Sequence, residues 1–542
     1  MKKISVLVIL VYWLTACLSP SPPAVPAIPL QSLATPKPSA LWISPGVPSM
    51  LLDAAKSWKI PNTDLPENAS IRLEVSPSFI PETSANGLIQ AQSLWVYALV
   101  APFPTVTDGV TLDELHAAWR GLPHDLFRDQ PLLMTESTLA AFSAMWGEPA
   151  LGAVKIVPED TLPDVAWESM PSWGITPFES IQPRWKVLTV DGQSPIRKDL
   201  ILDTYPLKVN FILITGEPSL EFDLPASNYD SSKVTTVILT GVTALTRATA
   251  DRMERKGITY PAQDVRDILV QADITHISNE VPFYSGCPAP DPHQDKEIFC
   301  SSTRYIELLT YVGTDIVELT GNHFGDYGPG AMLESLAIYN DHGIPYYGGG
   351  ADLADSLEPV TLESNGNRFA FIGCNQPDVE SFPTARESRP GAAPCDFDFM
   401  AEKVRELSSH GYFVFATFQW SESPGPEPYP AQVETFRRMA DSGAVAVSGS
   451  QAHVPQYMEF YKGSFIHYGL GNLFFDQTGG SDNTRNEFID RYIFYEGKFL
   501  GMELITTYLE DYSRPRFMTL NERESFLLQY FEGSGWLFST TH

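Results

Sequence analysis

Short apolar runs alternate with amphipathic stretches through the second half of the chain. Runs with the length and composition of strands lie at residues 235–240, 274–277, 315–319, 369–372, 413–418 and 444–447. Between them, residues 265–272, 306–312 and 332–339 place apolar side chains at helical spacing. This alternation predicts an α/β domain with a substantial sheet over residues 235–510, followed by a C-terminal extension over residues 511–542.

The first half is patterned as a second mixed α/β domain, over residues 41–224. Residues 94–100 read Leu-Trp-Val-Tyr-Ala-Leu-Val and predict a buried strand. Thr111, with Glu114 three residues later, has the spacing of a capping box and predicts the start of a helix. Polar turn-forming residues over 225–234 predict a linker between the two domains.

Length and composition agree with this division and exclude two classes of protein. The 542 residues suffice for two large domains or about three of average size. Hydrophobic residues make up 43% of the chain, which excludes wholesale disorder. The formal charge of −30 repels phosphate backbones, so we expect no nucleic-acid partner.

The N-terminus has the pattern of a targeting segment. Lys2 and Lys3 precede an apolar run over residues 4–16, the length of a signal-peptide core. Residues 14–17, Leu-Thr-Ala-Cys, resemble the bacterial lipobox. That resemblance implies a lipoprotein signal peptide over 1–16, lipidation of Cys17 and attachment to the extracytoplasmic face of a bacterial membrane; the alternative is an ordinary secretory signal. The proline-rich residues 17–40 predict an extended tether.

Four cysteines remain beyond Cys17, an even number that suits an oxidising compartment. Three connectivities can be drawn among them. The local pairings close short loops, so we predict the disulfides Cys287–Cys300 and Cys374–Cys395.

Polar motifs follow the predicted strands of the second half. They contain Glu280, Asn322 with His323 and Asp326, Gln419, Gln451 with His453, and Asn472. In α/β sheets ligands bind outside the carboxyl ends of the strands, so we expect these side chains to converge. Their carboxylate, amide and imidazole groups suit one divalent ion of the Zn, Mn or Fe type.

The motifs resemble those of the poly-γ-glutamate capsule-synthesis family, CapA. Residues 320–328, T-G-N-H-F-G-D-Y-G, resemble that family's A-N-N-H-x-x-D-x-G block. Residues 449–456, G-S-Q-A-H-V-P-Q, resemble G-x-H-P-H-V-x-Q, and residues 468–473, Y-G-L-G-N-L, resemble Y-S-L-G-N-F. The family is related to calcineurin-like metallophosphoesterases, which implies a pair of β-sheets flanked by helices and a dinuclear metal site.

The resemblance also implies roles for individual residues. The metal candidates are Glu280, Asn322, His323, Gln451 and His453, of which Asn322, His323 and His453 are also catalytic candidates. Asp326, Gln419 and Asn472 are expected around them. Three positions depart from the family, because Val242 replaces its metal-bridging Asp and Gln419 and Gln451 each replace a His. These departures favour one metal ion over two, or none.

The first half resembles phosphate-type periplasmic solute-binding proteins. The resemblance lies in residues 173–178 (W-G-I-T-P-F), 186–192 (K-V-L-T-V-D-G) and 205–207 (Y-P-L). It implies an α/β domain with either a working ligand site or only a retained scaffold.

Two functions follow from the sequence. The first is a surface-anchored, CapA-type, metal-dependent hydrolase that cleaves an amide, ester or phosphoester of an extracellular polymer. The second is a non-catalytic lipoprotein that binds cell-envelope material or a solute through a degenerate metal site.

Overall fold

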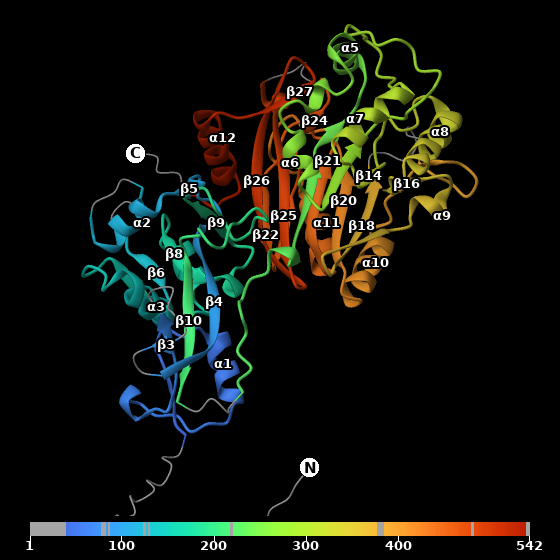
Figure 1. Ribbon diagram of the computed structural model, residues 1–542. Helices are drawn as coiled ribbons and strands as arrows, with labels where there is room; N and C mark the ends of the chain where they lie inside the picture. Colours follow the sequence, from blue (N-terminus) through green and yellow to red (C-terminus); the bar gives the residue numbers. More distant parts are fainter. Residues whose placement is uncertain are drawn as a thin grey trace, which may run out of the picture.

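The computed structural model describes residues 39–76, 83–84, 87–122, 126–127, 130–216, 221–376, 384–477 and 482–537. The predicted signal peptide, Cys17 and all but the last two residues of the tether lie outside the described residues. Figure 1 shows two halves, the first in blue to green and the second in green to red. No helix within the described ranges is long and apolar enough to cross a membrane.

The N-terminal half is built on a mixed sheet that the long strand β4 (Gly87–Pro102) runs through. One part of β4 pairs with β10 (Lys208–Thr215), and another pairs with β8 (Trp173–Pro177) and β9 (Trp185–Val190). The remaining strands of the half are β1 (Leu41–Ile43), β2 (Ile71–Ser76), β3 (Thr83–Ser84), β5 (Gly109–Val110), β6 (Leu132–Met134) and β7 (Val154–Ile156). The predicted strand over 94–100 is confirmed within β4, and its side chains from Trp95 onward are fully buried.

Four α-helices of this half pack around the sheet in the described ranges. They are α1 (Ser49–Ser57), α2 (Leu112–Trp119), α3 (Glu136–Trp146) and α4 (Leu162–Glu168). The predicted capping box at α2 is confirmed. The Thr111 hydroxyl accepts from the Glu114 backbone N–H at 3.2 Å, and the Glu114 carboxylate accepts from the Thr111 N–H at 2.7 Å.

The C-terminal half is a β-sandwich. Its first sheet follows the order β15-β14-β13-β11-β25-β26-β27, with β12 and β24 alongside. These strands are β11 (Val234–Thr240), β12 (Val242–Thr243), β13 (Ile274–Asn279), β14 (Ile316–Glu318), β15 (Tyr346–Tyr347), β24 (Asn472–Phe474), β25 (Asn486–Tyr495), β26 (Lys498–Glu510) and β27 (Arg514–Phe517). The predicted strands at 235, 274 and 315 are therefore confirmed.

The second sheet follows the order β17-β18-β20-β21-β23-β22. Its strands are β17 (Val360–Ser364), β18 (Asn367–Asn375), β20 (Phe413–Gln419), β21 (Ala444–Ser450), β22 (Met458–Tyr461) and β23 (Ser464–His467). The two sheets pack on one core of aromatic rings, as where Phe415 of β20 contacts Tyr492 of β25 edge to face with ring centroids 5.2 Å apart. A short pair, β16 (Gly349–Gly350) and β19 (Gly391–Ala392), lies outside both sheets.

Helices cover both outer faces of the sandwich, so the α/β class and the flanked pair of sheets are confirmed. On the first sheet they are α5 (Arg247–Lys256), α6 (Arg266–Val270), α7 (Ile306–Tyr311) and α8 (Gly328–Asp341). On the second they are α10 (Phe397–Ser409) and α11 (Pro430–Asp441), with the short α9 (Leu353–Ser356) nearby.

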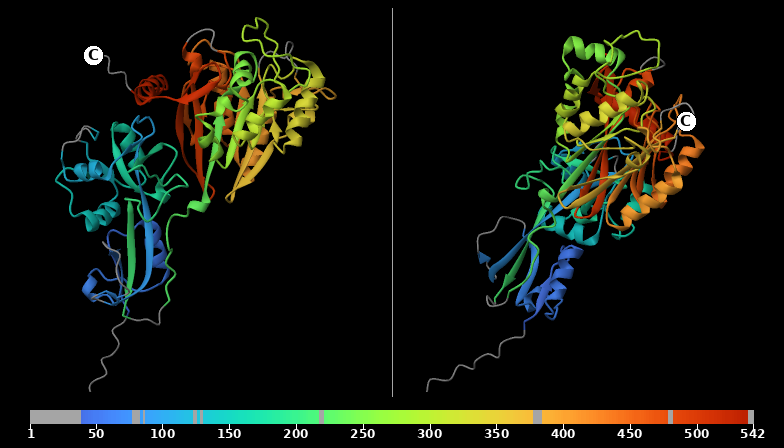
Figure 2. Two further views of the ribbon diagram at one scale, coloured as in Figure 1. Left: turned by 45° about the horizontal axis from the view of Figure 1, so that its top comes forward. Right: turned by 90° about the vertical axis from the view of Figure 1, so that its right-hand side faces the viewer.

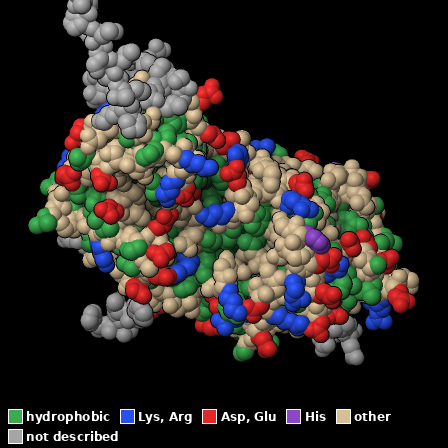
Figure 3. Space-filling view, turned by 90° about the horizontal axis from the view of Figure 1, so that it is seen from below, with side chains coloured by type: hydrophobic (Ala, Val, Ile, Leu, Met, Phe, Trp, Pro, Cys, Tyr) green, Lys and Arg blue, Asp and Glu red, His purple; other side chains and the backbone are tan. Residues whose placement is uncertain are grey.

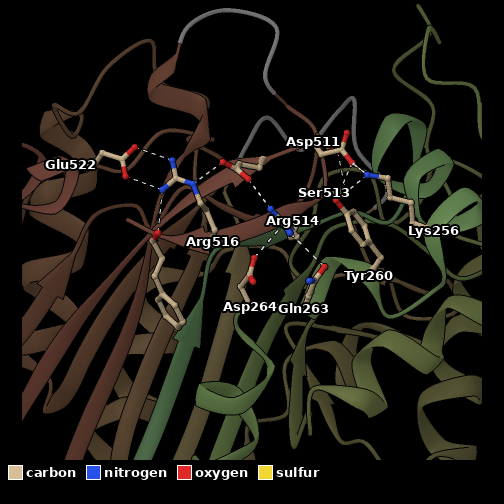
Figure 4. Close-up of polar contacts among 11 residues, drawn as sticks. Lys256, Tyr260, Gln263, Asp264, Asp511, Ser513, Arg514, Arg516 and Glu522 are labelled. Atoms are coloured by element: carbon tan, nitrogen blue, oxygen red, sulfur yellow. Dashed lines mark hydrogen bonds and ion pairs between the residues drawn. The ribbon is translucent and has the colours of Figure 1, made fainter. Parts of the chain in front are cut away.

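The described part of the predicted C-terminal extension is continuous with this sandwich. Strand β27 pairs with β26, and α12 (Leu520–Gly533) buries Phe526, Leu527 and Tyr530 in the sandwich core. Figure 4 shows the polar contacts that surround the β26–β27 turn. Arg516 bonds Glu510 at 2.7 Å and Glu522 of α12 at 2.8 Å, so strand and helix are joined.

The predicted linker packs against the N-terminal half. The side chain of Asn228 is buried and pairs with both backbone groups of Val96, accepting at 2.8 Å and donating at 2.9 Å. Figures 1 and 2 show α12 on the side of the sandwich that faces the N-terminal half. There Arg523 of α12 forms a two-pronged ion pair with Asp108, at 2.8 and 2.9 Å, which joins the halves.

Both predicted disulfides are present. Cys287 bonds Cys300 and Cys374 bonds Cys395, closing loops with sequence separations of 13 and 21. The first loop follows β13 and leads to Phe299, next to the candidate site.

Candidate functional site

The site candidates sit at the carboxyl ends of parallel strands from both sheets. Glu280 directly follows β13, and Asn322 and His323 follow β14. Gln419 is the last residue of β20, and Gln451 and His453 follow β21. Strands β13 and β14 are parallel neighbours, as are β20 and β21, so each pair delivers its polar residues to one edge.

A glycine lets the loop after β14 approach the end of β13. A Cβ atom at Gly321 would lie 2.5 Å from the Cα of Glu280. This distance is too short for any side chain to be accommodated at position 321. The absence of that atom lets Asn322 lie beside Glu280. The sequence motif Gly-Asn-His therefore has a steric basis at its first position.

The side-chain amide of Gln419 connects three of the candidates. Its Nε2 donates to Oε1 of Glu280 at 3.1 Å and to Oδ1 of Asn322 at 3.0 Å. Its Oε1 accepts from the hydroxyl of Ser450 at 2.7 Å. A carboxylate only accepts hydrogen bonds, so the nitrogen of Gln419 must face Glu280. One neutral NH₂ group thus uses both of its donors on two oxygens that the family resemblance assigns to a metal.

His323 is held by Asp326, which was expected beside it. Its Nδ1 lies 2.7 Å from Oδ2 of Asp326, and the same oxygen accepts from the backbone N–H of Phe299 at 2.7 Å. Burial lowers the pKa of His323, but the hydrogen bond with Asp326 and the charges of Glu280 and Asp326 outweigh it, so the pKa lies above its ordinary value. The site can therefore hold a proton at this imidazole.

His453 is held by Asn472 in a defined tautomer. The Asn472 amide nitrogen donates to the backbone carbonyls of His453 and Thr484 at 3.3 and 3.1 Å. Its Oδ1 therefore accepts from Nδ1 of His453, at 2.8 Å. The neutral imidazole then keeps the lone pair of its other nitrogen, Nε2.

The loop that carries Gln451 and His453 has an unusual backbone. Both residues have positive φ, 80° and 54°, in the left-handed region that non-glycine residues rarely adopt. Strain of this kind persists where the surrounding structure fixes a side chain, and it clusters at functional sites.

Apolar groups occupy the space beside the two histidines. A chain of ring contacts joins the two histidines. The ring centroids are 4.5 Å apart for His323 and Phe299, 6.3 Å for Phe299 and Phe475, and 5.3 Å for Phe475 and His453. Val242 belongs to the same small cluster as Phe299 and Phe475 and is fully buried. The position where the family has a bridging carboxylate is thus packed with hydrocarbon.

These contacts do not fit a dinuclear metal centre. Over the described ranges no group of three or more His, Cys, Asp or Glu side chains is placed to hold a metal ion. Glu280 and Asn322 each give an oxygen to Gln419, and Val242 offers no ligand. Two acceptor atoms nevertheless remain buried without a partner, Oε2 of Glu280 and Oε1 of Gln451, and each can accept a donor or a cation.

A polar cavity of about 960 Å³ opens beside His453. Charged side chains of both signs line it, namely Arg247, Asp251, Arg252 and Arg255 of α5 and Asp295 and Glu422 of loops. The guanidinium of Arg247 lies between the rings of Phe299 and Phe475, 4.8 and 5.0 Å from their centroids, and pairs with Asp476 at 2.9 Å.

The sequence did not single out Arg247, Phe299 or Phe475 for this site. Arg247 starts a helix 74 residues before the motif of His323 begins at Gly321, and no spacing rule links the two. The nearest signal in the sequence was Cys300. The predicted disulfide at Cys300 restricts the position of the residue before it, Phe299. These contacts form because loops that are distant in the sequence pack together in the folded chain.

The comparisons with known proteins identify the C-terminal half. Residues 236–477 match the family model described as bacterial capsule synthesis protein PGA_cap. The chain is 28% identical over 200 residues to the PGA biosynthesis protein CapA of Bacillus subtilis, covering 36% of this chain and 52% of the relative. It is 24% identical over 276 residues to the capsule biosynthesis protein CapA of Bacillus anthracis, covering 50% and 67%. The matches thus span about half to two thirds of these relatives.

Solved structures show weaker likenesses. One is the NAD nucleotidase of Haemophilus influenzae (TM-score 0.34, 9% identity, 56% of each chain). Another is an ABC-type phosphate transport receptor from Vibrio cholerae (TM-score 0.28, 12% identity, 34% of this chain and 88% of that one). At these scores neither likeness identifies a ligand or an activity. The matched range contains every candidate from Glu280 to Asn472, and residues 236–477 of this chain are therefore similar to the bacterial capsule synthesis family, CapA.

Proposed function

We propose that this protein is a polymer-binding component of a capsule or poly-γ-glutamate system, acting at the outer face of a bacterial membrane. The family match supports the capsule connection, and the relatives' names point to poly-γ-glutamate. The observation that carries the proposal is the amide of Gln419 between Glu280 and Asn322. It makes the site a hydrogen-bonding surface in place of a two-metal centre.

The adjoining cavity supports a ligand with both donors and acceptors. Its arginines present N–H donors that suit carboxylates, and its acidic side chains, such as Asp295 and Glu422, suit amide N–H groups. A chain of γ-linked glutamates carries a carboxylate and an amide in every unit. The mixture of basic and acidic side chains in the cavity therefore matches such a chain better than it matches a simple anion.

A second candidate is hydrolysis with a single divalent metal ion. One observation favours it: both His323 and His453 have Nδ1 held by a side chain, which is how metal-binding histidines are commonly oriented. In this case Nε2 of each imidazole and the free oxygens of Glu280 and Gln451 would have to move together to hold the ion, because no such group is placed to hold one within the described residues. A bound ion of this type activates water for attack on a carbonyl or phosphoryl centre.

The proposal also includes the location of the protein and the role of its N-terminal half. We propose that Cys17 carries the lipid anchor and that the proline-rich tether separates the folded halves from the membrane. The partners would be an extracellular polymer or cell-envelope material and the membrane itself. The N-terminal half would contribute a scaffold or a second solute site.

Calorimetric titration of the full chain with oligo-γ-glutamate, in the presence and absence of EDTA, tests this function. We expect binding that EDTA does not change and that Arg255→Gln weakens, because this exposed arginine lines the cavity, where it pairs with Asp251. The matched control is Arg304→Gln, an exposed arginine paired with Glu254 outside the cavity. Binding lost in EDTA and restored by Zn²⁺ or Mn²⁺, with cleavage of the oligomer, would establish the second candidate.

A further inference from the structure

A second cavity, of about 670 Å³, lies between the two halves, away from the candidate site. Its volume is within the range of about 300–1,000 Å³ that is typical of small-molecule sites. Side chains from both halves form an apolar lining that includes Phe103, Ile196, Met502, Leu504, Phe517 and Leu527. Figure 3 shows hydrophobic side chains gathered at this junction, with Lys and Arg side chains beside them.

One group of charges in the lining has more cations than anions. Arg197 of the N-terminal half and Arg491 of β25 both pair with the single carboxylate of Glu503. The Nε atoms of Arg197 and Arg491 are buried and have no hydrogen-bond partner. Burial and the neighbouring charge of Arg197 lower the pKa of Arg491 to about 10. This group therefore holds one uncompensated positive charge and two unused donors.

A second group repeats this arrangement. Lys186 and Arg523 share the carboxylate of Asp108, at 2.7 and 2.8 Å. The ammonium of Lys186 also donates to the backbone carbonyl of Thr105 at 2.7 Å. Burial and the charge of Arg523 lower the pKa of Lys186 to about 8, despite the opposing effect of Asp108. Two cations again face one anion.

Three of the remaining charged side chains of the lining have ion-pair partners outside it. Asp264 pairs with Arg514 at 3.4 Å, Asp267 with Arg266 at 3.6 Å, and Lys198 pairs with Asp273. Asp199 is the last acidic side chain of the lining, and its charge acts on Arg491. Over the whole lining five basic side chains face five acidic ones, so the excess of cations is local to the two groups, within a chain whose formal charge is −30.

We propose that this cavity binds an amphiphile with one apolar chain and an anionic carboxylate or phosphate head group. The apolar lining would take the chain, and the shared-carboxylate groups of Arg197 with Arg491 or of Lys186 with Arg523 would take the head. A neutral apolar ligand would leave the excess cations unmatched, and a cationic amphiphile would be repelled. A free anion would leave the apolar lining unused.

The test is calorimetric titration of the full chain with dodecanoate and with dodecyl phosphate, both below micelle-forming concentration. Dodecyltrimethylammonium and inorganic phosphate serve as comparison ligands. We expect one dodecyl anion per chain, with the tighter of the two ligands identifying the head group. We expect little binding of the dodecyl cation or of inorganic phosphate.

Two variants locate the binding without touching the core. Arg197→Gln removes one excess cation and should weaken binding by about tenfold or more, as loss of a charged hydrogen bond does. Phe517→Ser removes part of the apolar lining at a side chain that is 45% exposed and should also weaken binding. The matched controls are Lys233→Gln and Leu520→Ser, exposed positions outside the lining, which should leave binding unchanged.

Three results would overturn the proposal. The first is absence of dodecyl anion binding by the folded wild type. The second is equal affinity for inorganic phosphate, which would show an anion site without a chain site. The third is dodecyl anion binding that neither Arg197→Gln nor Phe517→Ser weakens, which would place it elsewhere. Each is independent of oligo-γ-glutamate binding at the other cavity.

Discussion

The side-chain nitrogen of Gln419 lies 3.0 Å from Oδ1 of Asn322, at the carboxyl edge where the two sheets meet. The same nitrogen bonds Glu280, which is almost completely buried. An amide here supplies two N–H donors without a charge. The carboxylate of Glu280 therefore depends on a neutral partner from the opposite sheet, and the two sheets are joined at this point.

We predict that Gln419→Leu destabilises the protein by about 3 kcal/mol. The substitution keeps the approximate size of the side chain but leaves Glu280 without its hydrogen bond inside the site, and buried charged groups without partners cost this much. Urea unfolding at neutral pH measures the change. The same substitution at exposed Gln271, which is outside the site, should change stability by less than about 0.5 kcal/mol. Equal effects at both positions would contradict a structural role for this amide.

A gain of metal affinity is expected when the two glutamines become histidines. The double variant Gln419→His, Gln451→His replaces two amides with imidazoles, one of them at the position that bonds Glu280 and Asn322. Imidazole is a far better zinc ligand than a carboxamide, so zinc affinity should rise by at least about tenfold over the wild type. Titration with Zn²⁺, followed by metal analysis of the dialysed protein, measures it. An unchanged zinc affinity in the folded double variant would show that the site geometry excludes a metal.

The buried carboxyl of Glu487 makes stability depend on pH. Burial raises its pKa well above the ordinary value, against a 2.7 Å hydrogen bond from the Thr507 hydroxyl that lowers it. Its protonation favours the folded state below pH about 4.5, and that contribution is lost as the pH rises through the folded pKa. Glu487→Gln should therefore stabilise the protein at pH 8 more than at pH 4.5. The difference should be about 1.4 kcal/mol for each pH unit by which the folded pKa exceeds the unfolded pKa, up to pH 8.

Urea midpoints at these two pH values measure this difference. The control is Glu363→Gln, an exposed carboxylate on β17. A parallel response of both variants to pH would show that the buried site is not responsible.

Helix α12 should be required for the stability of the sandwich. Phe526 is buried and stacks on Phe488 of β25 with ring centroids 4.7 Å apart. Phe526→Ala should cost about 3–5 kcal/mol, the usual range for a buried phenylalanine. Leu528 is on the same helix and is 42% exposed, so Leu528→Ala should cost much less. Thermal or urea unfolding of the two variants compares them directly.

Membrane attachment should depend on Cys17. We predict that Cys17→Ser releases the protein into the soluble fraction, because it removes the residue that would carry the lipid chains. Fractionation of cells and mass analysis of the N-terminal peptide check this. A wild type that is already soluble and carries no lipid would show an ordinary secretory signal instead.

Much of the architecture could be predicted because it depends on local pattern. The apolar runs at 235, 369 and 413 became buried strands, since a short apolar run between turn-forming residues is typical of a strand that is buried on both faces. The capping box could also be predicted, because its two partners, Thr111 and Glu114, lie within four residues of each other in the sequence. Both disulfides followed from short loops in the sequence.

The contacts of the site could be predicted only in part. The sequence placed Glu280, Asn322 and Gln419 at strand ends, because the carboxyl edge of a sheet collects such residues. It could not predict that the Gln419 nitrogen would bond both of the others, since this depends on how closely two sheets approach. The ring contacts of Phe299 and Phe475 also depend on loops that meet only in the folded chain.

The position of α12 has a consequence for how the protein forms during its synthesis. Its aromatic side chains fill a core whose other walls are made by Phe103 and by residues between 237 and 504. A nascent chain therefore exposes an unfilled hydrophobic slot until residues beyond 530 have emerged. Chaperones that shield such surfaces, during translation or on the far side of a membrane, have their longest opportunity to act on this domain just before it closes.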